Sequence, residues 1–238
     1  MIILTSDTDW VPDKVLDYFL DILDEYDAKA TIFATNKVSC RNHEAAIHPY
    51  PEISYDKQGY ARSSSFDTVE NLKKVFPQAL GTRSHGLIIS TDLLMGLPVL
   101  GIGYDSTYLL TFQNNIRPYN IYPGLLEIPI HWMDIEIMRF GKSLRLDNDY
   151  LRRQERSKAL YVYDFHPSHV FTNTFSLDFY YDVYKPHYTD LEYLEGKRNR
   201  NEFGTEDTLI QLLEVVDRTS LKVMKDIYLE WNEKMNKK

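Results

Sequence analysis

The sequence is poor in the residues that mark several classes of protein. A single cysteine, Cys40, stands among 238 residues, so no disulfide forms within the chain and a reducing compartment is expected. No run reaches the ~18 uncharged apolar residues of a membrane-spanning helix. The chain starts without a basic and then apolar leader, which also favours a cytoplasmic protein. Ten glycines and ten prolines are too few for a collagen-like or low-complexity chain.

Positive charge is also scarce. The chain has 27 Lys and Arg against 35 Asp and Glu, for a net charge of −8. Nucleic-acid backbones and anionic membranes attract basic faces, so neither is an expected partner. The rest of the composition is that of a globular protein, 43% hydrophobic and 26% charged. We expect one domain over residues 1–238, and the sequence makes no prediction of oligomeric state.

Strand and helix patterns alternate along the chain. Apolar runs predict buried strands at residues 2–5, 30–34, 44–47, 79–82, 99–104, 125–130 and 160–165. Helical spacing predicts helices at residues 12–26, 66–76, 90–97, 206–217 and 220–235. Residues 49–65 have the composition of a loop, and residues 178–203 that of an irregular, tyrosine-rich excursion. The alternation predicts an α/β fold with a parallel sheet or barrel inside and helices outside.

Polar side chains gather where the predicted strands end. Chemistry in such folds collects at the carboxyl ends of parallel strands, so this coincidence is the main functional signal. The residues concerned are Asp7, Asp9, His48, Arg83, His85, Asp105, His131, His166 and His169.

These residue types suit a metal site with acid/base groups. Asp7 and Asp9 are two apart, so on an extended chain both point the same way; the alternative is a cap for the helix at 12–26. Histidines with a carboxylate form the usual ligand set of catalytic zinc, although any one histidine is more often structural. Arg83 needs a carboxylate partner, Asp7 or Asp105, and the alternative is a surface ion pair of little energy.

The ordered set of motifs resembles the NodB-homology polysaccharide deacetylases, carbohydrate esterase family four. The nearest branch is the WbmS-like deacetylases of bacterial surface-polysaccharide loci. The matching blocks are residues 3–9 (ILTSDTD), 29–35 (KATIFAT), 43–48 (HEAAIH), 81–86 (GTRSHG), 103–106 (GYDS) and 164–167 (DFHP). Two departures stand out. Thr8 separates the two aspartates, and Glu52 occupies the place of the usual second histidine ligand.

The resemblance implies a distorted, incomplete (β/α) barrel of seven strands. It also implies a metal-dependent hydrolase that removes an acetyl group from a sugar or polysaccharide precursor, with N-acetyl preferred to O-acetyl. A divalent metal, expected to be zinc, is held by Asp9, His48 and a third ligand, for which His85 is preferred to Glu52. The other implied roles are Asp7 as base, Arg83 as its orienting partner, His166 as acid, and Asp105, His131, Trp132 and His169 on the substrate side. Asp105 is also a candidate partner that orients His166 or Arg83.

Two other functions stay open. One is a degenerate, non-catalytic carbohydrate-binding protein, and the other is a metal-dependent amidase or cyclic-imidase relative acting on a small non-sugar amide. The 18 tyrosines bear on substrate binding. Several follow His48 or His169, where their rings suit sugar faces, although ordinary packing explains them equally well. These tyrosines are Tyr50, Tyr55, Tyr60, Tyr180, Tyr181, Tyr184 and Tyr188.

Overall fold

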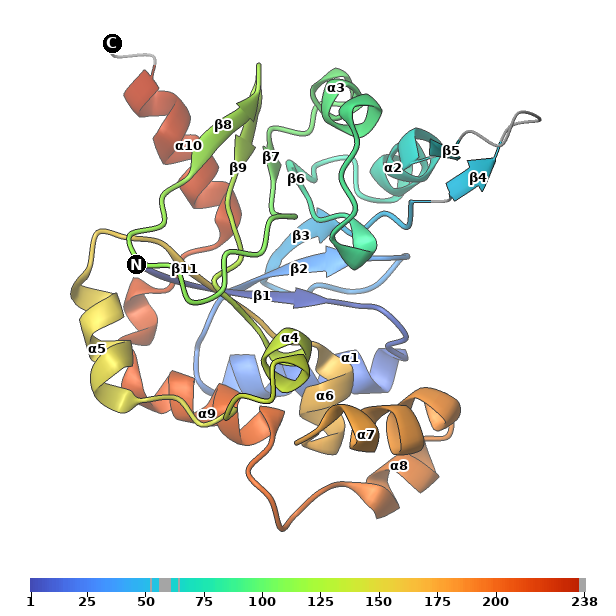
Figure 1. Cartoon of the computed structure of the whole chain (residues 1–238), viewed down its shortest axis with the longest axis vertical. Coiled ribbons are helices and arrows are strands. Elements are labelled where there is room, and N and C mark those ends of the chain that lie inside the picture. The colour runs from blue at the N-terminus through green and yellow to red at the C-terminus, as the bar shows by residue number, and fades with distance from the viewer. Residues whose placement is uncertain (52, 56–60, 64, 236–238) are drawn as a thin grey trace.

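A curled sheet with helices on its outer side forms the body of the chain (Figure 1). The computed structural model describes residues 1–51, 53–55, 61–63 and 65–235, with backbone alone at 53–55, 61–63 and 65. The strands are β1 (Ile2–Asp7), β2 (Ala30–Ala34), β3 (Glu44–Ile47), β4 (Ile53–Tyr55), β5 (Ala61–Ser63), β6 (Gly81–Thr82), β7 (Tyr104–Asp105), β8 (Tyr119–Tyr122), β9 (Leu125–Glu127), β10 (Trp132–Met133) and β11 (Tyr161–Asp164). The helices are α1 (Asp13–Glu25), α2 (Ser65–Val75), α3 (Thr91–Val99), α4 (Asp134–Arg139), α5 (Asn148–Arg156), α6 (Pro167–Thr172), α7 (Leu177–Phe179), α8 (Leu191–Lys197), α9 (Thr205–Val215) and α10 (Met224–Met235).

The main sheet has the order β10-β11-β1-β2-β3-β6-β7-β9-β8. All neighbours are parallel except β8 and β9. Figure 1 shows β6 to β9 turned steeply away from β1 to β3, which makes an open half-barrel. The predicted α/β incomplete barrel is therefore confirmed, but its strand number is corrected. Within the described residues the sheet has nine strands, not seven.

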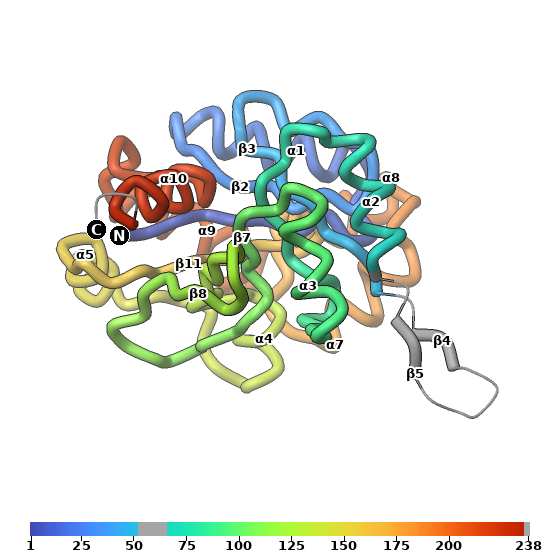
Figure 2. The backbone as a smooth tube through the Cα atoms, turned by 90° about the horizontal axis from the view of Figure 1, so that it is seen from above, coloured from blue at the N-terminus to red at the C-terminus, as the bar shows by residue number. Residues whose placement is uncertain are grey.

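The alternation of side chains along β1 places polar groups inside the half-barrel. Ile2 and Leu4 face outward into a core shared with α1, α6 and α9. Ile3 faces inward and packs with Met224 and Ile227 of α10. Figure 2 shows α10 beside the amino end of β1, so this helix closes one end of the half-barrel. Since every second residue shares a face, Thr5 and Asp7 follow Ile3 to the inside, near the open carboxyl end.

Some elements differ from the sequence prediction. Helix α3 runs to Val99, so the strand predicted at 99–104 is reduced to β7. Residues 49–65, predicted as loop, contain the paired strands β4 and β5. The irregular excursion predicted at 178–203 is corrected to a succession of short helices: a π-helical turn (Tyr180–Tyr184), a 3-10 turn (Lys185–His187) and α8. No helix in the described part of the chain is long and apolar enough to cross a membrane.

Candidate active site

The carboxyl edge of the sheet gathers side chains from four strands. Asp7 ends β1, His48 follows β3 directly, and His166 follows β11. His85 lies in a 3-10 turn (His85–Leu87) after β6. Pairing between β3 and β6 continues past the strands, because Arg83 N donates to Ile47 O (3.0 Å) and His85 N donates to Pro49 O (2.9 Å). The two histidines are thereby brought side by side.

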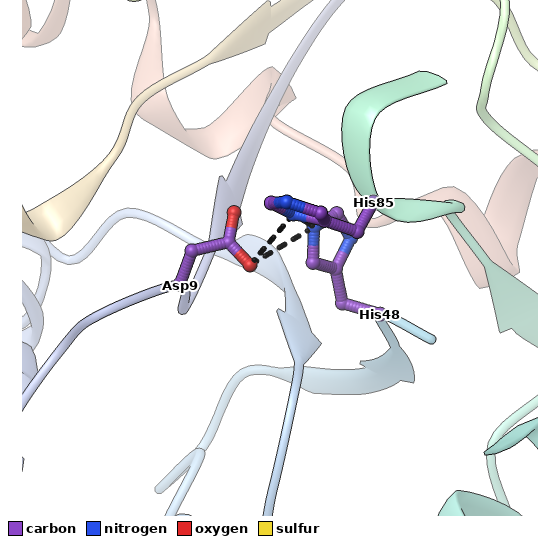
Figure 3. A group of neighbouring side chains, drawn as sticks. All are labelled: Asp9, His48 and His85. Carbon is purple, nitrogen blue, oxygen red and sulfur yellow. Dashed lines mark hydrogen bonds and ion pairs between the residues drawn. The ribbon is translucent and has the colours of Figure 1, made fainter. Parts of the chain in front are cut away.

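Asp9, His48 and His85 form a tight triangle of donor atoms (Figure 3). Asp9 Oδ1 lies 3.2 Å from His48 Nε2 and 3.2 Å from His85 Nδ1, and the two nitrogens are 3.4 Å apart. Ligand atoms around a tetrahedral zinc with bonds of about 2.0–2.1 Å are separated by about 3.3–3.4 Å. The three side chains therefore fit a divalent metal of this kind. Glu52, the alternative third ligand, lies outside the described residues.

The charges around this triangle favour a cation. Burial alone would raise the pKa of Asp9, but His48 and His85 outweigh it and hold the pKa well below its ordinary value. Burial would likewise lower the pKa of His48, but the carboxylates of Asp7 and Asp9 raise it. The aspartates do not cap α1, because its N-cap is Pro12 and no side chain caps the helix there.

Arg83 is fully buried and holds Asp7 in place. Its guanidinium donates to Asp7 Oδ1 (2.8 Å) and to Asp164, the residue beside Thr5 on β11. Its Nε donates to Ser106 O (2.9 Å), and its centre lies 4.2 Å from the Phe33 ring centroid. Burial raises the pKa of Asp164 to about 6 despite the nearby guanidinium. Of the two partners predicted for Arg83, the contact is therefore with Asp7, and Asp164 takes the place expected for Asp105.

A second group is built on Asp134, at the start of α4. Asp134 Oδ1 accepts from His166 Nδ1 (2.7 Å), and its Oδ2 accepts from His166 N (2.8 Å) and lies 3.0 Å from His169 Nδ1. Burial opposes a charged His166, but Asp134 outweighs it and raises the pKa of His166 to about 10. Burial lowers the pKa of His169. Sequence reasoning missed Asp134, although an acidic residue after an apolar run and a histidine was an available signal.

A cavity of about 430 Å³ opens over the triangle and over His166 of the second group. Asp7, Asp9, His48, His85 and His166 all line it. Its rim adds aromatic and charged side chains, namely Trp10, Tyr180, Tyr181, Glu136, Arg139 and Lys185. A larger cavity, about 650 Å³, is lined by His43, Lys29 and Lys225 at the other end of the sheet and holds none of these site residues.

Four residues predicted on the substrate side do not line the cavity at the active site. Trp132 is in the outer core against Tyr163 and Phe165, because alternation turns its neighbour Met133 inward instead. His131 precedes β10 and contacts Gln154 of α5. His169 is completely buried behind His166. These placements correct the prediction, which considered strand ends but not the face to which each side chain points.

Asp105 is the fourth of these residues. Its Oδ1 accepts from Thr107 Oγ1 (2.8 Å), whose oxygen in turn accepts from Ser84 N (3.0 Å). It pairs in register with the buried Glu127, and burial raises the pKa of both carboxyls. Asp105 therefore supports the loop between Arg83 and His85 through Thr107, and Asp134 rather than Asp105 orients His166.

Comparison with known proteins agrees with the fold and the motif order. Residues 4–184 match the family described as WbmS-like polysaccharide deacetylase. A candidate polysaccharide deacetylase involved in O-antigen biosynthesis from Bordetella bronchiseptica is 24% identical, with 90% of each chain covered and a TM-score of 0.77. A candidate polysaccharide deacetylase from Mycobacterium smegmatis is 16% identical, with 98% of this chain and 90% of that chain covered and a TM-score of 0.55. No curated protein matches the sequence.

The fold is thus that of the polysaccharide deacetylases, with a half-barrel and its acidic and histidine side chains at the carboxyl edge. Within that class, the chain belongs to the WbmS-like polysaccharide deacetylase family, since the match covers most of its length.

Proposed function

We propose that the chain is a metal-dependent deacetylase that hydrolyses an acetyl group on a sugar or polysaccharide precursor, with N-acetyl preferred to O-acetyl as the substrate. The observation that carries this proposal is the convergence of a metal-binding triangle, a carboxylate outside it and a carboxylate-bound histidine on one cavity. Amide hydrolysis needs these three parts: an electrophilic centre, a base for water and an acid for the departing nitrogen.

The metal is assigned to Asp9, His48 and His85, with zinc as the expected ion. Two imidazoles and a carboxylate are a known catalytic zinc set, and the spacing of their donor atoms suits tetrahedral geometry. When bound, such an ion supplies Lewis-acid chemistry by polarising the acyl carbonyl and lowering the pKa of water. Asp9 and His48 are buried, and charges attract a bound cation more strongly away from water.

Asp7 is the proposed base. Arg83 binds Asp7 Oδ1, which leaves Asp7 Oδ2 toward the cavity at 3.8 Å from His48 Nε2. The guanidinium fixes the rotation of the carboxylate through this contact. Asp7 then takes a proton from the attacking water.

His166 is the proposed acid. The bond from His166 Nδ1 to Asp134 keeps the proton on that nitrogen and turns Nε2 away from Asp134, and the ring lines the cavity. The raised pKa keeps the imidazole charged at neutral pH, so Nε2 carries a proton to give. His166 donates it to the sugar nitrogen as the carbon–nitrogen bond breaks.

The substrate side of the proposal rests on the rim of the cavity. Tyr180 and Tyr181 line it together with Trp10, and amphipathic rings suit sugar faces. Tyr55 and Tyr60, expected in the same role, lie outside the described side chains. The acidic composition and single cysteine support a cytoplasmic precursor, such as a nucleotide-linked or lipid-linked acetamido sugar.

An acetate-release assay tests the proposal. Purified protein loaded with zinc is incubated with nucleotide-linked and lipid-linked acetamido sugars, an O-acetyl sugar and small non-sugar amides and cyclic imides. We expect release from an acetamido sugar and none from the Asp7→Asn variant. Binding of these sugars without release favours the non-catalytic alternative, and turnover of the non-sugar amides alone favours the amidase alternative. Either result contradicts the proposal.

A further inference from the structure

We propose that Tyr50 is a positioning residue of the metal centre, and that it sets the affinity of the chain for a divalent cation. This inference rests on the proposed metal site of Asp9, His48 and His85. Tyr50 follows His48 by two residues, yet its side chain contacts the two other members of the triangle. It therefore links groups that come from separate loops.

The first contact fixes Asp9. Tyr50 Oη donates a hydrogen bond to Asp9 Oδ1 at 2.9 Å, the same oxygen that faces both histidine nitrogens. A carboxylate oxygen has two lone pairs, so it can accept this bond and still bind a cation with the other. The hydrogen bond thus holds the carboxylate in the rotation that turns the second lone pair toward His48 and His85.

The second contact fixes His85. The rings of Tyr50 and His85 are stacked, with centroids 3.9 Å apart and planes 21° from parallel. His85 is the member of the triangle that most needs this support. Its side chain is 35% exposed, against 2% for His48 and 10% for Asp9, and it lies in a single 3-10 turn. Stacking restricts rotation of the imidazole and keeps Nδ1 on the cavity side.

The backbone puts Tyr50 in reach of both partners. His85 N donates to Pro49 O at 2.9 Å, so the residue before Tyr50 is bonded to the residue under its ring. Preorganised ligands bind a metal more tightly, because less rotamer freedom is lost on binding, and partners of ligands typically change affinity 10–100-fold when removed. A tyrosine that holds two of three ligands is placed to produce an effect of this size.

Two variants separate the contacts. Tyr50→Phe removes the hydrogen bond to Asp9 and keeps the stacked ring, and Tyr50→Leu removes both. Metal-free protein is titrated with Co²⁺, and the visible absorption of the bound ion reports affinity and coordination without any turnover. Tyr181→Leu is the matched control, since Tyr181 lines the same cavity and is exposed. Circular dichroism and melting of the metal-free proteins check that each variant folds.

We expect Co²⁺ affinity to fall about 10-fold in Tyr50→Phe and up to about 100-fold in Tyr50→Leu, with an altered spectrum in the latter and no change in Tyr181→Leu. If folded Tyr50→Leu binds Co²⁺ as the wild type does, and Asp9→Asn does not, the role of Tyr50 is wrong while the metal site stands. If the wild-type protein does not bind Co²⁺, or Asp9→Asn binds it equally well, the metal site itself is wrong and the role of Tyr50 falls with it.

Discussion

Two groups of the same composition lie at the active-site cavity, one lining it with all three residues and the other reaching it through His166 alone. They differ in how the carboxylate is shared. In the group of Asp9, His48 and His85, one oxygen, Asp9 Oδ1, contacts both histidines. In the group of Asp134, His166 and His169, each carboxylate oxygen contacts a different imidazole ring. In the first arrangement the three donor atoms point to one place. In the second the carboxylate lies between the two imidazole rings.

The origin of the side chains explains this difference. The converging group takes one residue from each of three loops, and all three side chains line the cavity. His166 and His169 are three residues apart, at the start of α6, and pack on one carboxylate beneath the surface. Three donor atoms that point to one place suit a bound cation. A carboxylate between two imidazoles suits the orientation of one protonated ring. For this reason we propose a metal role for the first group and an acid role for His166 of the second.

Replacing Asp7, which lies between the two groups, is expected to have the largest effect on turnover. Asp7→Asn keeps the shape and the contact with Arg83 but removes the proposed base, so kcat should fall by about 10²–10⁴-fold. Bound zinc, measured by mass spectrometry, should stay at the wild-type level because Asp7 is outside the triangle. A variant with near wild-type kcat would show that the base is another group.

Removing the carboxylate of Asp134, between the two imidazoles of the second group, should have a smaller and pH-dependent effect on turnover. Asp134→Asn is expected to lower kcat/KM on the order of 10²-fold at neutral pH. The acid acts while protonated, so the rate falls as pH rises through the pKa of His166. Asp134 raises that pKa, to about 10. Its loss should therefore move the alkaline limb of the pH–rate profile to lower pH, and an unmoved limb would contradict the role of Asp134.

Replacing His169, on the far side of Asp134 from His166, should have the smallest effect on turnover. His169→Asn retains a nitrogen near the position of Nδ1, and His169→Leu does not. The expected loss in kcat is about 5–10-fold for Leu, the size of effect of one lost polar contact with Asp134, and less for Asn. Equal losses in both variants, with equal loss of thermal stability, would indicate packing rather than orientation of Asp134.

Motifs in the sequence were sufficient to predict the α/β half-barrel and to single out Asp9, His48 and His85, which the fold brings together, because local signals mark both. The run at β1 is apolar and ends in Asp7 and Asp9, and the six buried apolar residues of α1 recur at helical spacing. Short elements carry too little pattern. Strand β10 has two residues, and β8 is partly exposed, so neither shows a continuous apolar run.

The remaining site residues depended on long-range contacts. Asp164 was visible in its motif, but its bond to Arg83 requires the pairing of β11 with β1. Asp134 contacts a histidine 32 residues further along the chain. Trp132 and Met133 are neighbours in sequence, and only the register of β10 decides which of them faces the cavity. Spacing alone gives no information on that register.

The zinc content of three proteins, the wild type, Asp9→Asn and Asp134→Asn, tests most directly which of the two groups binds the metal. Each is purified with zinc present, passed through gel filtration and measured by mass spectrometry. The account predicts about one zinc in the wild type and in Asp134→Asn, and nearly none in Asp9→Asn. Loss of zinc in Asp134→Asn with retention in Asp9→Asn would place the metal in the other group and contradict the central claim.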